Sequence, residues 1–321
     1  MTDPERTLRA AFESAASRVD VAPDALPAIR AKVGRRVRRR RTLTASLAVA
    51  AAVAVIAGGL TFALGRPAPV VQPGPADSST ITQPSTPDTS PAPGIGVRVP
   101  VYFVGESGKL FREFQFLTVP QDTLPDRINA AVRRSVGGVA YDPDYDTAWP
   151  PEFGVAGVSV DGGVATLELT GPAAPSNPIA AQQLVYTATA VAADQGTQLS
   201  GVRVLVNGVA LPGGDLVRAP ALDTLAPLWL ISPQQGESMA PPVDVHVNGA
   251  VFEATARVRV RDAGGAVVDD QVLTLDAGAP ARGEGRVQFT LAPGRYTIEV
   301  FFVSMKDGSE LGLDDHEITV V

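Results

Sequence analysis

The stretch VAGVSVDGGVATLEL, residues 155–169, decides the fold of the region that surrounds it. Apolar residues alternate with small or polar residues on both sides of Asp161, Gly162 and Gly163, as they do in strands that bury one face. An Asp-Gly pair between two such runs favours a tight hairpin turn, because glycine readily adopts the positive φ angles of these turns. The stretch therefore predicts two antiparallel strands joined at residues 161–163.

Two helices and three further strands are expected around this hairpin. Alternating apolar residues predict strands at 97–104 and 110–119, joined by a turn at 106–109, and a last strand at 201–207. Helices are expected from Thr123 to about Val136 and from Asn177 to about Ala193, since each start combines a capping residue with a nearby proline. Residues 97–213 are thus predicted to form one α+β domain.

Four pieces of this domain stand in a recognisable order: VYFV at 101–104, the hairpin at 155–169, QLVYT at 183–187 and VRVLVNG at 202–208. Together they resemble the GerMN domain of bacterial spore-germination proteins. The resemblance implies a link to spore germination or to assembly of the cell envelope. The loop at 141–151 departs from this pattern, because it carries more aromatic and acidic residues than the resemblance implies.

The region after residue 226 contains a series of short strands without helical periodicity. Strands are expected at 229–233, 243–247, 252–261, 267–275, 285–291, 295–304 and 316–321. This density of strands favours an all-β sandwich over residues 226–321. The pieces ISPQQG at 231–236, VNG at 247–249, FEA at 252–254 and SMKDGSE at 304–310 resemble the immunoglobulin-like domain that often follows GerMN in spore-germination proteins.

The N-terminal third of the chain predicts a membrane anchor. Residues 42–64 (TLTASLAVAAAVAVIAGGLTFAL) carry no charge and follow six arginines within residues 35–41. A helix needs roughly 20 apolar residues to cross a bilayer, and basic flanks stay on the cytoplasmic side. We expect a single-pass transmembrane helix at 42–64, with a basic helical segment at 1–41 in the cytoplasm and a disordered Pro/Ser/Thr-rich linker at 65–96 outside. A cleaved signal peptide and a buried core helix are the alternatives.

Charge and composition exclude several classes of function. Residues 1–41 carry a net charge of +6 and the remainder −13, so nucleic acid is not an expected partner of the outer domains. The chain contains no cysteine, which excludes disulfides, thiolate metal sites and a lipid-modified cysteine. His246 is expected at the surface of a strand and His316 in solvent before the last strand, so a catalytic triad is not supported. We therefore expect neither an enzyme nor a bound cofactor.

The loop at 141–151 holds the candidate ligand-binding residues. They are Tyr141, Asp142, Asp144, Tyr145, Asp146 and Trp149. Aromatic loop residues can stack on a sugar or a peptide, although they can also pack on their own domain. The alternate carboxylates suggest a calcium loop, but Thr147 and Phe153 stand where an EF-hand needs Gly and Glu. An exposed acidic loop is therefore favoured over a metal site, and Asp314, Asp315 and Glu317 are a weaker metal candidate.

These observations predict a membrane-anchored, extracytoplasmic binding or scaffold protein of the bacterial cell envelope. Its expected partner is a cell-wall polymer or an envelope protein. Two alternatives stay open. One is an envelope enzyme that acts on peptidoglycan through the acidic loop, and the other is a transmembrane regulator that signals through residues 1–34.

Overall fold

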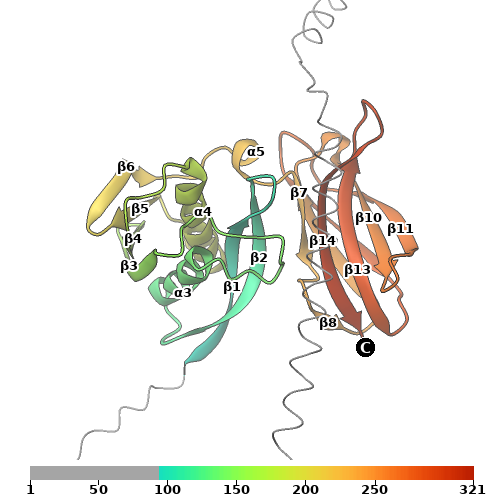
Figure 1. The fold of residues 1–321 in the computed structure, drawn as a ribbon, viewed down its shortest axis with the longest axis horizontal. Coiled ribbons are helices and arrows are strands. Elements are labelled where there is room, and N and C mark those ends of the chain that lie inside the picture. Colours follow the sequence, from blue (N-terminus) through green and yellow to red (C-terminus); the bar gives the residue numbers. More distant parts are fainter. Residues whose placement is uncertain (1–93) are drawn as a thin grey trace, which may run out of the picture. The chain divides into compact units, whose positions relative to one another are not determined.

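The computed structural model describes residues 94–321, which form a mostly β-sheet fold with few helices (Figure 1). The predicted segment 1–41, the predicted transmembrane helix at 42–64 and all but the end of the predicted linker lie outside the described residues. Within residues 94–321, no helix combines the length and the apolar character needed to cross a membrane.

Two sheets and two helices build the first domain. Strand β1 (Ile95–Val104) pairs antiparallel with β2 (Leu110–Val119). The second sheet has the order β3 (Gly154–Asp161), β4 (Val164–Thr170), β5 (Gly201–Val206) and β6 (Val209–Leu216), in which β4 and β5 are parallel. Helices α3 (Leu124–Val136) and α4 (Pro178–Asp194) contact each other and both sheets (Figure 1). This arrangement confirms the two predicted helices and the predicted hairpin.

Local capping explains where the helices begin. The side chain of Thr123 accepts a 3.3 Å hydrogen bond from the N–H of Asp126, and the side chain of Asn177 accepts one of 3.1 Å from the N–H of Ile179. Each bond satisfies a donor that has no partner inside its helix. A proline follows each cap within the first turn, where its missing N–H costs nothing.

Strand β6 was not expected from the sequence. It pairs antiparallel with β5 at the edge of the sheet, so the prediction that 201–207 is the last strand is wrong. Most of its residues are exposed, and its middle holds Pro212, Gly213 and Gly214. The alternation of buried and exposed residues that signals a strand is therefore absent.

The second domain is a sandwich of two sheets, preceded by the short helix α5 (Ala221–Thr224). One sheet has the order β12 (Gly283–Phe289), β9 (Val243–Gly249) and β7 (Leu228–Ser232). The other has the order β11 (Val267–Thr274), β10 (Thr255–Asp262), β13 (Gly294–Val303), β14 (Glu310–Val320) and β8 (Ser238–Met239). Fully buried side chains from both sheets, such as Val245, Val258 and Ile298, form its core. The predicted sandwich of short strands is therefore present.

Two strand boundaries differ from those predicted. Residues Phe252–Ala254 form a 3-10 turn instead of the start of β10, and Glu253 takes a φ of 56°. The last strand begins at Glu310 rather than at residue 316, because it pairs with β13, where Val300 lies opposite Asp314. Cross-strand hydrogen bonds stabilise this extension, and the local sequence gives no sign of them.

Candidate functional site

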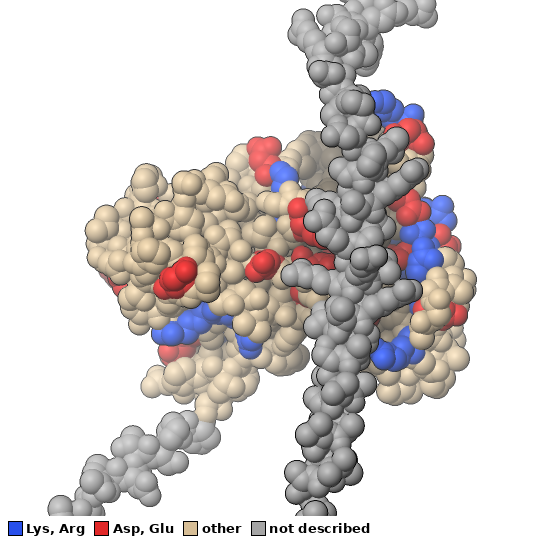
Figure 2. Space-filling view, viewed as in Figure 1, with Lys and Arg blue, Asp and Glu red and all other residues tan. Residues whose placement is uncertain are grey.

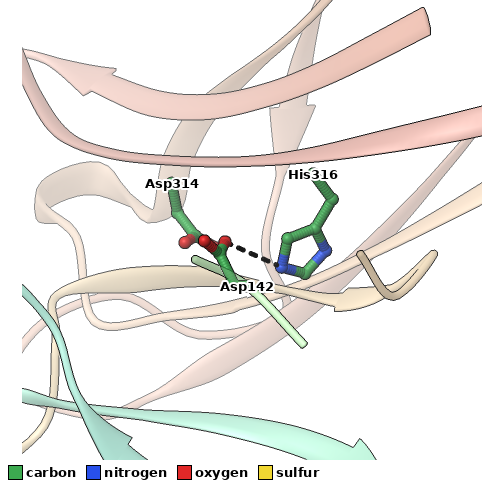
Figure 3. A group of neighbouring side chains, drawn as sticks. All are labelled: Asp142, Asp314 and His316. Carbon is green, nitrogen blue, oxygen red and sulfur yellow. Dashed lines mark ion pairs between the residues drawn. The ribbon is translucent and has the colours of Figure 1, made fainter. Parts of the chain in front are cut away.

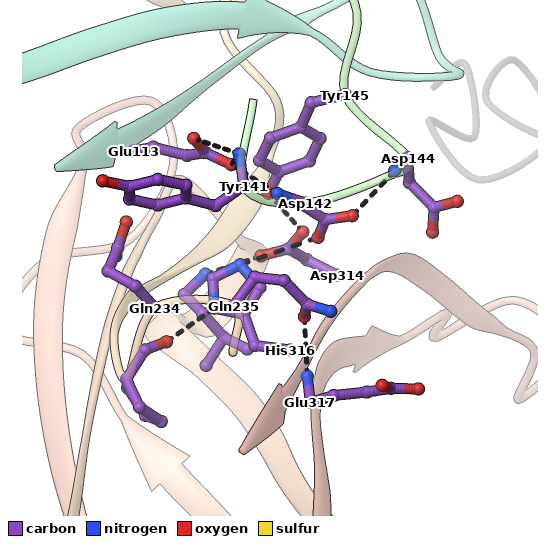
Figure 4. Close-up of polar contacts among 12 residues, drawn as sticks. Glu113, Tyr141, Asp142, Asp144, Tyr145, Gln234, Gln235, Asp314, His316 and Glu317 are labelled. Carbon is purple, nitrogen blue, oxygen red and sulfur yellow. Dashed lines mark hydrogen bonds and ion pairs between the residues drawn. The ribbon is translucent and has the colours of Figure 1, made fainter. Parts of the chain in front are cut away.

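The loop between α3 and β3 is held firmly against the first two strands. The backbone of Asp146 exchanges two hydrogen bonds with Val104, of 2.7 and 2.9 Å. The buried carboxylate of Glu113 on β2 accepts the N–H groups of Tyr141 at 2.9 Å and Asp142 at 2.8 Å (Figure 4). These contacts fix the loop in a conformation that places the side chain of Asp142 against the second domain.

Asp142 meets Asp314 and His316 of β14 in a group that we call the interdomain cluster (Figure 3). One ligand-capable atom of each residue lies within 4.8 Å of those of the other two. Oδ2 of Asp142 is 3.7 Å from Nε2 of His316. The three residues are 2%, 3% and 1% exposed, so the cluster is closed to solvent. It joins the two domains by buried polar groups.

Hydrogen bonds from both domains orient the two carboxylates. The hydroxyl group of Tyr145 donates to Oδ1 of Asp314 at 2.6 Å, and the N–H of Leu230 donates to Oδ2 at 2.7 Å. The N–H of Asp144 donates to Oδ1 of Asp142 at 2.8 Å. Carboxylates held in this way keep one orientation, and their charge is partly compensated by the donors.

The electrostatics of the cluster favour a positive charge at its centre. Burial raises the pKa of Asp142 to about 8, against the opposing effect of His316. Burial also raises the pKa of Asp314. For His316, burial lowers the pKa, but the carboxylates of Asp314 and Asp142 together outweigh it, so the pKa is raised overall. The two acids therefore favour the protonated, positively charged form of His316.

The six residues proposed as ligand contacts do not form one exposed surface. Asp142, Tyr145 and Trp149 are buried, Asp144 is half-buried, and Tyr141 and Asp146 are exposed. The ring of Tyr145 packs 4.8 Å from that of Phe111, and Nε1 of Trp149 donates a 3.0 Å hydrogen bond to the carbonyl of Ala180. The rings of Tyr145 and Trp149 therefore pack on their own domain, which is the alternative that the sequence left open. Ligand binding by the exposed residues stays a prediction.

The prediction that His316 is solvated is wrong, because the strand that contains it starts six residues earlier than predicted. A signal for this was present in the sequence. Ile318 and Val320 are buried on the inner face of β14, and His316 and Asp314 continue the same alternation. His246 lies partly buried on β9, where Nη2 of Arg286 is 2.9 Å from its Nδ1.

A second feature, which the sequence reasoning missed, is a row of arginines stacked on aromatic rings in the first domain. The guanidinium groups of Arg98 and Arg112 lie 3.9 and 5.0 Å from the ring centre of Phe114. That of Arg218 lies 4.8 Å from the ring centre of Tyr186. Pairing of β1 with β2 places Arg112 opposite Tyr102. The signal was the alternation of arginine and aromatic residues on one face of these strands.

We call the hollow lined by Arg112 and Arg218 the arginine groove. It has a volume of about 230 Å³, and Tyr102, Arg112, Phe114 and Arg218 line it with Asp194 at its wall. A neighbouring hollow of about 580 Å³ shares Ala193 and Arg218 with it, which extends the groove along α4.

The three arginines stacked on aromatic rings in the first domain lack carboxylate partners. Arg98, Arg112 and Arg218 form no ion pair with any acidic side chain in residues 94–321, and Nε of Arg112 is buried without a hydrogen-bond partner. In the second domain, by contrast, Arg259 binds both Glu299 at 2.6 Å and Glu310 at 2.8 Å. Figure 2 shows side chains of both signs interspersed over that domain.

Comparison with protein families matches both domains. Residues 100–212 match the family described as sporulation and spore germination, and residues 228–309 match the immunoglobulin-like domain of bacterial spore germination. These matches confirm both resemblances. Comparison with curated proteins gave no significant match.

Solved structures with local similarity include two from one sporulation protein. The first GerMN domain of GerM from Bacillus subtilis is 18% identical, with 40% of this chain and 96% of that chain covered and a TM-score of 0.28. The tandem GerMN domains of GerM are 12% identical, with coverages of 61% and 62% and a TM-score of 0.29. An engineered protein is 20% identical with a TM-score of 0.25; the match covers 34% of this chain and spans only 22% of that protein.

Proposed function

We propose that this chain, which carries a GerMN domain followed by the immunoglobulin-like domain of bacterial spore germination, is a non-enzymatic binding protein of the cell envelope. Its ligand is an anionic cell-wall polymer. The arginine groove is the binding surface, and the second domain supports it.

The observation that carries this proposal is that the arginines of the groove form no ion pair with an acidic side chain in residues 94–321. Guanidinium groups bind carboxylates and phosphates through two parallel hydrogen bonds, and stacking on aromatic rings holds them ready for such contacts. Arg112 and Arg218 line the same hollow. Cell-wall polymers carry carboxylate or phosphate groups along an extended chain, which suits a groove that continues past Arg218.

In this proposal, the predicted transmembrane helix at 42–64 anchors the binding protein in the membrane. Its flanking arginines orient the N-terminus toward the cytoplasm, so the groove would face the cell wall. The linker at 65–96 would hold the domains away from the membrane surface. Protease treatment of intact cells tests this orientation: cleavage of residues 94–321 with protection of residues 1–41 is the expected result, and the reverse pattern contradicts it.

Cosedimentation of the full-length protein, in detergent, with purified cell-wall sacculi tests the function. Binding without release of soluble fragments is expected. Sacculi stripped of phosphate-containing polymers distinguish the two anions: binding that persists identifies carboxylates, and binding that disappears identifies phosphates. Absence of binding to both preparations contradicts the proposal.

The two alternatives from the sequence have their own outcomes. Soluble fragments released from sacculi would support the peptidoglycan-acting enzyme. The burial of Asp142 and Tyr145 argues against an open catalytic site in that loop. A change in transcription after deletion of residues 1–34, with normal sacculus binding, would support the transmembrane regulator.

A further inference from the structure

Three buried side chains that can each offer a ligand atom to a metal ion meet in the interdomain cluster. Asp142 and Asp314 contribute one carboxyl group each, and His316 contributes an imidazole. Buried charges are strongly destabilising unless a partner or a bound ion compensates them. A cation next to His316 would compensate the carboxylates of Asp142 and Asp314 when they are ionised.

The orientation of His316 shows where that cation belongs. Its Nδ1 lies 2.6 Å from the carbonyl oxygen of Pro233, and because a carbonyl only accepts, Nδ1 must carry the proton. Nε2 then faces Asp142 and Asp314 and is buried without a hydrogen-bond partner. Metal-binding histidines commonly donate their other N–H to a backbone carbonyl in this way.

The distance from His316 to Asp142 also fits a shared ion better than direct contact. A hydrogen bond would bring the two atoms to about 2.9 Å, whereas the observed separation is 3.7 Å. Two ligands that each bind one tetrahedral Zn²⁺ at about 2.0 Å lie about 3.3 Å apart. A small movement of either side chain would therefore bring the two atoms to the separation of ligands on one ion.

We propose that Asp142, Asp314 and His316 form a structural zinc site that locks the first domain to the second. One imidazole nitrogen and two carboxylate oxygens are ligands that Zn²⁺ accepts, whereas Ca²⁺ prefers six to eight oxygens, at least twice the three ligands that this cluster offers. A dication also matches the two negative charges that Asp142 and Asp314 carry when ionised. Tyr145 and Leu230 supply the outer hydrogen bonds that hold Asp314 in position.

Zinc titration of the full-length protein, after removal of bound metal with a chelator, tests this site. One ion per chain is expected to bind by calorimetry, and X-ray absorption should show nitrogen and oxygen ligands at about 2.0 Å. The His316→Gln variant should bind zinc at least about tenfold more weakly. The matched control is His246→Gln, which alters the only other histidine of the chain.

Each remaining outcome decides the proposal. If His316→Gln fails to fold, as judged by circular dichroism, Asp142→Asn takes its place and should show the same loss, with Asp144→Asn on the same loop as its control. Zinc binding by the wild type that is unchanged in the folded cluster variant overturns the proposal. So does the absence of zinc binding by the wild type, which would mean that a proton provides the positive charge.

Discussion

The hydroxyl group of Tyr145 donates a 2.6 Å hydrogen bond to the carboxylate of Asp314, and this bond joins a loop of the first domain to strand β14 of the second. The two residues are 7% and 3% exposed. A loop that the sequence indicated as an exposed acidic segment is therefore part of the contact between the domains.

Replacing Tyr145 with Phe should destabilise the protein by about 1–3 kcal/mol, because Oδ1 of the buried Asp314 carboxylate loses its donor. Urea unfolding in the presence of a chelator measures this loss without a contribution from bound metal. Tyr141→Phe is the matched control, since its hydroxyl group is near the surface and accepts only the N–H of Phe116. Equal losses in the two variants would contradict the role of Tyr145 in joining the domains.

Trp149→Phe should lower the free energy of unfolding by about 1–3 kcal/mol and leave binding to sacculi unchanged. The substitution removes the hydrogen bond to the carbonyl of Ala180 and part of the edge contact with Phe153, whose ring centre lies 5.1 Å away. Unfolding and cosedimentation are measured on the same preparation. Loss of binding at unchanged stability would instead show that Trp149 contacts the ligand.

Gln in place of Arg112 should weaken sacculus binding by about tenfold or more, since each charged hydrogen bond contributes about 1.5–3 kcal/mol. Arg203→Gln is the control, because that arginine is already paired with Asp215 at 2.7 Å. Raising the salt concentration from about 0.1 M to 1 M shortens the Debye length from about 10 to 3 Å. Binding by the wild type should therefore fall with salt, and a binding curve insensitive to salt would refute an electrostatic groove.

Gly283→Ala should lower the free energy of unfolding by about 1–3 kcal/mol, because the added methyl group would meet the backbone of Ala277 and the carboxylate of Asp276. Gly96→Ala is the matched control on an exposed part of β1, where an added methyl group has no neighbour within 4 Å. Its effect should stay within about 0.5 kcal/mol. Thermal unfolding compares the two variants.

Glu310→Gln should remove part of the stability that the protein gains above about pH 5. The hydrogen bond from Arg259 lowers the pKa of Glu310 below its unfolded value, near 4.3. The stabilisation is therefore present at neutral pH and is lost as the pH falls through the lowered pKa. Because the side chain is 47% exposed, the difference should not exceed about 1 kcal/mol.

Urea unfolding of the wild type and of Glu310→Gln at pH 7 and near pH 3 measures this difference. On an Arg259→Gln background, the same substitution should give a smaller pH-dependent difference, since the hydrogen-bond partner is absent and only the charges of Arg257 and Arg261 remain. A pH dependence of undiminished size on that background would assign it to other groups.

The sequence by itself determined the elements whose signals are local. The Thr123 and Asn177 caps set the starts of α3 and α4, and Gly162 and Gly163, with φ angles of 55° and 80°, form the predicted turn between β3 and β4. Alternating apolar residues marked most strands of the sandwich. These features depend on neighbours within a few residues, so a single sequence is enough to reveal them.

Only the tertiary structure decided the interdomain cluster and the arginine groove. Asp142 and Asp314 come from different domains, and β14 extends back to Glu310 because β13 supplies its hydrogen bonds. Acidic residues are normally exposed, so no local pattern predicts that both carboxylates are buried beside His316. Their burial depends on contacts between distant parts of the chain, and those contacts exist only after both domains have folded and packed together.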